Sequence, residues 1–158
     1  MLSESEYTRY AELYMDMVFR VAFSYVKNRT DADDVTQAVF LRLWKRRPAL
    51  ETDAHAKYWL LRVTINESKR LLCAPWRLAV PLDSETDAAA LPSSEHRELL
   101  DAVLRLKPKY RAAIYLYYYE GLSTEEIAHM LNVPRNTVLT HLRRAREQLK
   151  FELTEAEQ

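Results

Sequence analysis

The sequence predicts an all-α protein made of two small helical domains joined by a flexible linker, the C-terminal one a helix-turn-helix. Its 158 residues include one glycine, Gly121, and six prolines, and apolar residues recur at helical spacing along most of the chain. The periodicity disappears over 73–93, where three of the prolines fall among clustered acids. We therefore expect one domain over 1–72, a linker over 73–93 and a second domain over 94–158.

Composition excludes several classes of function. Loops that cradle phosphates need several glycines close together, so the single Gly121 excludes nucleotide-binding P-loops and dinucleotide-binding folds. The single cysteine, Cys73, allows neither an internal disulfide nor a thiolate metal cluster, and the four histidines are scattered. No apolar run reaches membrane-spanning length and no signal pattern opens the chain. We expect a cytoplasmic protein that is not an integral membrane protein and not an enzyme, with no cofactor, metal site or catalytic residue.

Three helices are expected in the N-terminal domain. The first covers 3–27 and is rich in aromatic and aliphatic residues. The second covers 30–47, with Thr30 as its N-cap, acids in its first turn and Pro48 after its end. The third covers 53–72. Together they would form a compact helical domain.

Four helices are expected in the C-terminal domain, over 94–106, 108–119, 123–131 and 134–153. Ser123 and Glu126 have the spacing of a capping box, which fixes the start of the third of these helices. Asn132 tolerates left-handed backbone and separates the last two helices. A short helix, a tight turn and a longer basic helix form the helix-turn-helix pattern.

The formal net charge of zero conceals two basic segments. Residues 42–80 hold nine bases and three acids, and residues 135–150 hold five bases and one acid. An acidic stretch over 81–101 separates them. This pattern indicates two places where a polyanion could bind.

The helix over 134–153 separates into two faces. Its buried stripe would contain Val138, Leu142, Ala145 and Leu149. Polar and basic side chains suited to base edges and phosphates lie on the opposite face and its flanks. The candidates for binding duplex DNA in the major groove are Arg135, Asn136, Thr137, Thr140, Arg143, Arg144 and Arg146. The alternative is a solvated basic helix that binds no ligand.

The helix over 53–72 carries a basic wedge beside aromatic residues. Arg62, Asn66, Lys69 and Arg70 fall within one sector of roughly 100° on the helix. Tyr58 and Trp59 lie at the N-terminal end of this sector. Cations for the backbone and rings for stacking are what a single nucleic-acid strand requires. The alternative is that the two aromatic side chains belong to the core.

The helix over 30–47 is apolar over too much of its circumference for an ordinary surface helix. One stripe, which would face the core, contains Ala32, Val35, Val39 and Leu43. A second group, which we call the second apolar group, lies on the other side. It contains the apolar residues Phe40, Leu41 and Trp44, with Asp33 and Gln37 beside them. The excess apolar surface indicates either two-sided burial within the domain or a protein partner.

Three sequence segments resemble the extracytoplasmic-function sigma factors of bacterial RNA polymerase. They are TDADDVTQAVFLRLWKR, KYWLLRVTIN and LKPKYRAAIYLYYYEGLSTEEIAHMLNVPRNTVLTHLRRAREQL, in the family's order and with its gap. The resemblance covers nearly the whole chain. Its most specific part is the string EGLSTEEIA, followed by NVPRNTV and LRRAR.

The resemblance implies a role for each part of the chain: to bind core polymerase and direct promoter recognition, DNA melting and transcription initiation. The domains would be sigma regions 2 and 4, and the helix matching 31–47 would dock on core RNA polymerase through the second apolar group. The loop matching 48–56 and the next helix would hold the non-template strand of the minus-ten element, with one base extruded. The basic helix would read the minus-thirty-five element of the promoter DNA, and the linker would pass near the polymerase active site. An anti-sigma factor, in this family often membrane-bound, is a further implied partner.

Four departures from the family pattern concern the choice of promoter rather than the class of protein. Ala38 stands where an acid is common, Leu139 where a basic residue is common, and Asn136 where a glycine is usual. The stretch 67–70 matches the family only loosely. Two other readings of the residues stay open. One is a stand-alone regulator that binds a palindrome as a dimer, and the other is a polymerase-binding adaptor with weak affinity for DNA.

Overall fold

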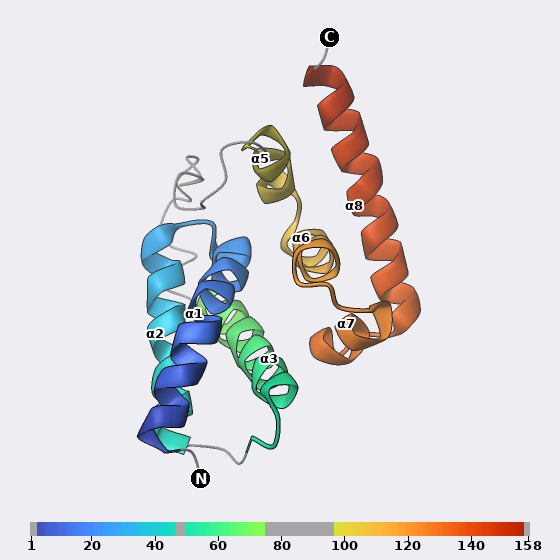
Figure 1. Ribbon diagram of the computed structural model, residues 1–158. Helices are drawn as coiled ribbons and strands as arrows, with labels where there is room; N and C mark the ends of the chain where they lie inside the picture. The colour runs from blue at the N-terminus through green and yellow to red at the C-terminus, as the bar shows by residue number, and fades with distance from the viewer. Residues whose placement is uncertain (1–2, 47–49, 75–96, 157–158) are drawn as a thin grey trace. The chain divides into compact units, whose positions relative to one another are not determined.

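The computed structural model describes residues 3–46, 50–74 and 97–156, and every regular element in that part of the chain is helical. The chain divides into two compact units, Met1–Leu82 and Asp83–Gln158 (Figure 1). The helices are α1 (Glu4–Val26), α2 (Arg29–Arg46), α3 (Asp53–Leu72), α5 (Arg97–Arg105), α6 (Pro108–Ile114), α7 (Thr124–Leu131) and α8 (Arg135–Ala156), with a π-helical turn, η2 (Tyr115–Tyr119), after α6. The prediction of an all-α fold with a C-terminal helix-turn-helix is confirmed. Apart from Cys73 and Ala74, the predicted linker lies outside the described residues.

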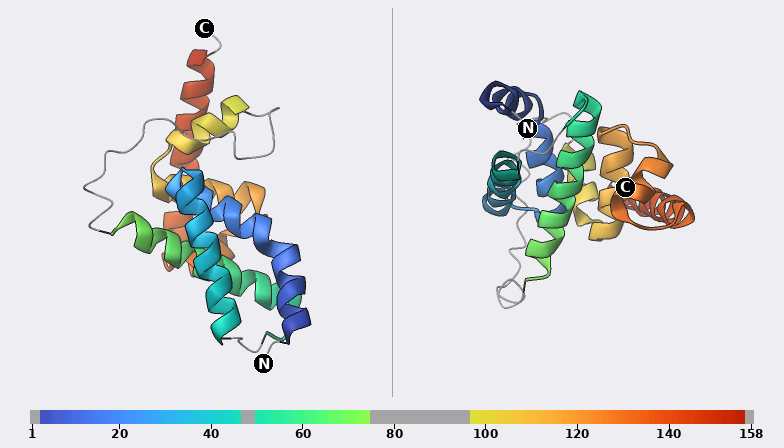
Figure 2. Two further views of the ribbon diagram at one scale, coloured as in Figure 1. Left: turned by 90° about the vertical axis from the view of Figure 1, so that its left-hand side faces the viewer. Right: turned by 90° about the horizontal axis from the view of Figure 1, so that it is seen from below.

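In the first unit, α1 packs against α2 and α3, and α2 also packs against α3 (Figure 2). The α1 helix starts with a capping box in which the Ser3 hydroxyl accepts from the Glu6 amide and the Glu6 carboxylate accepts from the Ser3 amide. It ends at Lys27, whose φ of 64° reverses the chain toward α2. The core between the three helices is aliphatic and aromatic, with Phe23 and Leu43 fully buried.

The start of α2 differs from the prediction. Thr30 was expected as the N-cap, but the helix begins at Arg29 and the capping side chain is that of Asn28. The Asn28 amide oxygen accepts from the Asp31 amide at 2.8 Å, and its amide nitrogen donates to the Asp31 carboxylate at 2.7 Å. Asn28 thereby satisfies a free donor of the first turn and also holds the acid that interacts with the helix dipole.

The start of α3 is held by its own cap and by α1. The Thr52 hydroxyl accepts from the His55 amide at 3.0 Å. The guanidinium of Arg9 lies 2.9 Å from the carboxylate of Asp53, and the Tyr14 hydroxyl donates to the Asp53 carbonyl at 3.2 Å. The bounds of α3 agree with the predicted 53–72. These contacts fix where the helix that carries the basic wedge begins.

In the second unit, α8 packs against α5, α6 and α7. A buried arginine connects the shorter helices: Arg111, with 1% of its surface exposed, donates to the carbonyl oxygens of Leu104 at 3.2 Å and Leu106 at 2.9 Å. These carbonyls lie at the end of α5, where helix donors are lacking and where a cation is favoured by the dipole. Arg111 therefore joins α5 to α6 and so supports the surface on which α8 lies.

The helix predicted over 108–119 is interrupted. It is α-helical to Ile114 and then widens into η2, in which the Glu120 amide donates to the Tyr115 carbonyl at 3.3 Å. The rings of Tyr115 and Tyr119 stack at 5.1 Å, and the Tyr115 hydroxyl bonds the Glu120 carboxylate at 3.2 Å. Gly121 follows with a φ of 70°, a left-handed conformation that glycine adopts at no steric cost because it has no Cβ. The segment thus ends in a sharp turn toward α7.

Candidate nucleic-acid interface

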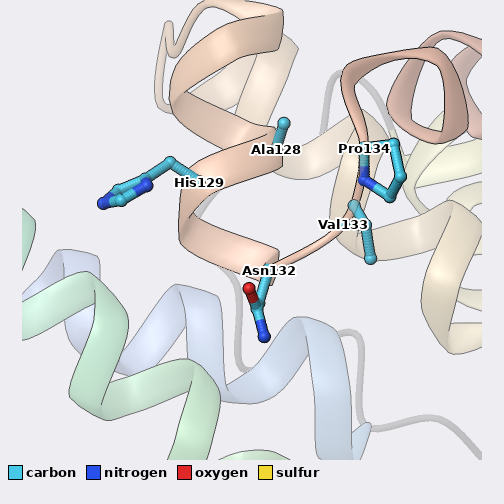
Figure 3. Close-up of a pocket in the computed structure, with 5 residues that line it drawn as sticks. All are labelled: Ala128, His129, Asn132, Val133 and Pro134. Atoms are coloured by element: carbon cyan, nitrogen blue, oxygen red, sulfur yellow. The ribbon is translucent and has the colours of Figure 1, made fainter.

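The helix-turn-helix is built from local sequence signals. The Ser123 hydroxyl accepts from the Glu126 amide at 3.1 Å, and the Glu126 carboxylate accepts from the Ser123 amide at 3.0 Å, so the predicted capping box is present. Asn132 has the predicted left-handed backbone, with a φ of 56°. The bend forms a shallow pocket lined by Ala128, His129, Asn132, Val133 and Pro134 (Figure 3). This bend sets the direction in which α8 leaves α7.

The buried stripe of α8 agrees with the prediction. Val138, Leu142 and Ala145 are at most 1% exposed, and Leu149 is half-buried. A helix held along one side in this way presents its opposite side to a ligand. The orientation of the predicted DNA-reading face is therefore fixed by packing within the unit.

The centre of the reading face, which we define as Asn136, Thr140 and Arg143, is open to solvent. Asn136 and Arg143 are exposed, and among the described residues neither side chain has a hydrogen-bond or ion-pair partner. Thr140 is half-buried and its hydroxyl donates to the Asn136 carbonyl at 3.0 Å. Thr137 is half-buried beside them. An arginine and an amide that are unengaged and one helical turn from a threonine suit the edges of base pairs.

On one flank of this face, Arg135 is held by α7. Its Nε lies 2.9 Å from the Glu125 carboxylate and 3.1 Å from the Thr124 hydroxyl oxygen. The pKa of Glu125 lies below its ordinary value. The first cause is a hydrogen bond from the backbone amide of Glu125 itself, and a further cause is the positive charge of Arg135. Arg135 is thus oriented before any ligand binds, and part of its charge is balanced.

Arg146 has partners that the sequence reasoning missed. Its Nε donates to the Tyr118 hydroxyl at 2.7 Å, and the guanidinium lies 5.7 Å from the ring centre of Tyr117 and 5.5 Å from that of Tyr118. Cation–π contacts of this kind stabilise the charged group against two aromatic rings. The pattern YLYYY was visible in the sequence, but the π-helical turn that aims two of its rings at α8 was not.

The wedge predicted on α3 is present as an exposed surface. Its four polar members, Arg62, Asn66, Lys69 and Arg70, are all exposed, and Tyr58 and Trp59 are half-buried at its N-terminal end. Sequence reasoning missed Glu67, which lies 3.2 Å from Arg70 and 2.9 Å from Arg42 of α2. The three-residue spacing of Glu67 and Arg70 is the sequence signal that could have revealed part of this network.

The second apolar group of α2 lines a groove that α1 completes. The groove has a volume of about 510 Å³ and is lined by Tyr7, Met15, Asp33, Thr36, Gln37, Phe40, Leu41 and Trp44. All five residues predicted for docking therefore come together. Leu41 and Trp44 are 51% and 38% exposed, whereas Phe40 is only 4% exposed because it packs inward against Tyr7. Tyr7, which was not predicted, also meets the ring of Trp44 at 5.0 Å.

Within the described residues there is no group of three or more His, Cys, Asp or Glu side chains that could hold a metal ion. In the same part of the chain, no helix is both long enough and apolar enough to cross a membrane.

Comparison with known proteins decides the family. The model described as Sigma-70 region 2 matches residues 10–77, and the one described as Sigma-70, region 4 matches residues 96–149. An RNA polymerase sigma-E factor of Streptomyces avermitilis is 31% identical over 152 residues, which cover 94% of this chain and 85% of that protein. The chain belongs to the extracytoplasmic-function sigma factors.

Other relatives of this sigma factor agree. The ECF RNA polymerase sigma factor SigE of Mycolicibacterium smegmatis is 33% identical over 148 residues; the match covers 87% of this chain and 57% of that longer protein. The RNA polymerase sigma factor SigV of Bacillus subtilis is 28% identical over 139 residues, covering 86% of this chain and 84% of SigV. The sigma factor RpoE of Bartonella quintana, solved with the anti-sigma factor NepR, shares the fold at a TM-score of 0.79 and 22% identity, covering 94% of this chain and 97% of RpoE.

Proposed function

We propose that this sigma factor binds core RNA polymerase and directs promoter recognition, DNA melting and transcription initiation. The observation that carries the proposal is the presence, on one chain, of three surfaces of different chemistry. They are the open reading face on α8, the exposed basic wedge on α3 and the apolar groove between α1 and α2. A stand-alone duplex-binding regulator requires only the first of them.

Recognition of the minus-thirty-five element is assigned to α8. With Asn136, Thr140 and Arg143 toward the floor of the major groove, arginine and amide groups reach base edges. Arg135, Arg144 and Arg146 lie on the flanks, toward the phosphates that border the groove. Thr137 lies next to Arg144 on one of these flanks. Leu139, which is 39% exposed on the same helix, adds no cation to this surface.

Melting of the minus-ten element is assigned to the wedge on α3. Unpairing costs stacking and pairing energy, which contacts available only to the separated strand can offset. Arg62, Lys69 and Arg70 supply charge for the backbone, Asn66 supplies hydrogen bonds, and Tyr58 and Trp59 supply rings beside the wedge. The protein thus acts by binding rather than by catalysis, and it requires no cofactor.

Docking on core polymerase is assigned to the groove. Leu41 and Trp44 present apolar surface whose removal from water favours association. Asp33 and Gln37 are exposed beside them and supply polar contacts. The proposed activity takes place in the cytoplasm, where RNA polymerase works. The related RpoE was solved with an anti-sigma factor, and we propose that a protein of this class also binds this chain.

The test is run-off transcription with purified core RNA polymerase on genomic fragments, with and without the protein. Core polymerase alone does not start at promoters, so discrete transcripts that depend on the protein are the expected result. Mapping of their start sites then yields both promoter elements. Binding to core without transcripts from any fragment would favour an adaptor. Binding to duplex DNA without any binding to core would favour a regulator, and the proposed function would be wrong.

A further inference from the structure

Cationic side chains gather around the ring of Tyr110, where α6 begins and packs against α8. The Lys109 ammonium lies 5.1 Å from the ring centre, and Arg144 donates to the Tyr110 hydroxyl at 3.4 Å. The ring of His141 meets that of Tyr110 edge-on at 5.4 Å. Lys107, Lys109 and Arg144 are all exposed, and Lys107 is the N-cap of α6. The cluster therefore joins two helices around one buried aromatic ring.

The positive charge of this cluster is not balanced within the described residues. None of the ion pairs found there involves Lys107, Lys109 or Arg144, in contrast to Arg135, which pairs with Glu125. A hydrogen bond from Arg144, and then the charges of Lys109, Arg144 and Lys107, lower the pKa of Tyr110. Like charges held close together repel, and a bound anion relieves that repulsion.

The cluster meets α8 at Arg144, on the side of the helix opposite Arg135. Arg135 and Arg144 are nine residues apart, which at roughly 100° per residue places them on opposite sides of the helix. Arg135 contacts α7 on its side, and Arg144 contacts Tyr110 of α6 on the other. Asn136 and Thr140, of the reading face, lie between them.

This arrangement fits a duplex rather than an isolated anion. A helix is about as wide as the major groove, so when its reading face points to the base pairs its two sides face the two phosphate backbones. Contacts to phosphates fix the position of such a helix without reading sequence. A cationic cluster beside the reading face, with no acid paired to it in the described part of the chain, lies where one backbone would pass.

We propose that Lys107 and Lys109, together with Arg144, form a phosphate-binding site for one backbone of the duplex that α8 reads. The inference rests on the proposed function and extends the DNA-binding surface from the helix-turn-helix to the start of α6. Neither lysine was predicted from the sequence, because both precede the helix-turn-helix and their proximity to Arg144 depends on how α6 packs against α8.

The test compares two double variants of the full chain, each assembled with core polymerase. One is Lys107→Gln with Lys109→Gln, and its matched control is Lys107→Arg with Lys109→Arg, which keeps both charges. The probe is a duplex fragment that carries the upstream promoter element, and affinity is measured between about 50 and about 200 mM salt. The glutamine variant should lower the slope of log affinity against log salt by about two, close to one unit per phosphate contact. The arginine variant should keep the wild-type slope.

Selectivity provides the second readout. The ratio of affinities for the promoter element and a scrambled duplex should be the same in both variants and the wild type, because phosphate contacts carry no sequence information. The inference is wrong if the glutamine variant keeps the wild-type slope, if the arginine variant loses as much as the glutamine variant, or if the ratio falls. It is also wrong if the glutamine variant loses affinity for core polymerase alone. A wild-type holoenzyme that fails to bind or transcribe any promoter would instead refute the proposed function.

Discussion

The carboxylate of Glu67, on α3, lies 2.9 Å from the guanidinium of Arg42, on α2. The same carboxylate lies 3.2 Å from Arg70, and its side chain is only 11% exposed whereas that of Arg70 is 81% exposed. One acid therefore ties two helices of the first unit together and balances part of the charge of the wedge assigned to single-stranded DNA. We therefore expect the loss of this acid to change stability and DNA affinity in opposite directions.

Glu67→Gln should lower the stability of the protein and raise its affinity for single-stranded DNA. Loss of a partly buried ion pair should cost up to about 1 kcal/mol in the free energy of unfolding, measured by urea titration. Removal of the negative charge beside Arg70 should tighten binding of a labelled minus-ten strand by the holoenzyme. Asp34→Asn, which removes an exposed acid from α2, is the charge-matched control and should leave both quantities unchanged. Weaker strand binding by Glu67→Gln would show that the wedge is assigned wrongly.

Leu41→Ser should weaken binding to core polymerase by about tenfold, since it removes exposed apolar surface from the proposed docking groove. Leu13→Ser is a closely matched control, because Leu13 is 53% exposed and Leu41 51%, and Leu13 does not line the groove. Affinity can be measured with fluorescently labelled protein and purified core, and thermal unfolding checks that both variants fold. Equal losses from the two substitutions would mean that the groove is not the docking surface.

Arg143→Ala should reduce discrimination between the promoter element and its single-base variants by about 1–3 kcal/mol at the position that the arginine reads. Transcription from a library randomised over the upstream element measures this directly. Lys150→Ala, farther along α8, should change no base preference. Affinity for core polymerase should be unchanged in both. If Arg143→Ala lost core binding instead, the reading face of α8 would be wrong.

Structural features that depend only on residues close together in the sequence were predictable. The Ser123–Glu126 capping box is found as expected because a cap requires only a hydroxyl and a carboxylate at fixed spacing. Asn132 adopts the left-handed backbone because a short polar side chain tolerates it. The Thr30 cap was wrong because two side chains only two residues apart, those of Asn28 and Thr30, were chemically suitable. Asn28 prevailed through its second hydrogen bond to Asp31.

Features that depend on packing were not predictable. Tyr118 and Arg146 are 28 residues apart, and their hydrogen bond requires both the π-helical turn and the docking of α8. Arg42 and Glu67 are 25 residues apart on different helices. The five residues predicted for docking line one groove and the four polar residues of the wedge are exposed on α3, since helical periodicity already places each set on one face. The contribution of Tyr7 to the groove could not be foreseen, because periodicity within α2 carries no information about which part of α1 lies against it.

The pKa of His141 depends on the charge of the cluster around Tyr110. Burial first, and then the charges of Lys109 and Arg144, lower the pKa of His141 below its ordinary value of 6.5. Since the unfolded chain binds this proton more readily than the folded protein, stability that is fully present above about pH 6.5 should decline as the pH falls below it. The other titratable group in contact is Tyr110, whose pKa is lowered by the hydrogen bond from Arg144 and then by the charges of Lys109, Arg144 and Lys107.

Lys109→Gln should therefore raise the pKa of His141, because it removes one of the two cations that oppose protonation. Burial and Arg144 remain, so the pKa should stay below 6.5. Titration of the histidine resonances by NMR measures the shift, and His141→Gln identifies the resonance. The decline in thermal stability between about pH 7.5 and about pH 5.5 should also be smaller in Lys109→Gln. A pKa that fell or did not move would mean that Lys109 does not act on His141, and the charge of the cluster would then be smaller than its geometry implies.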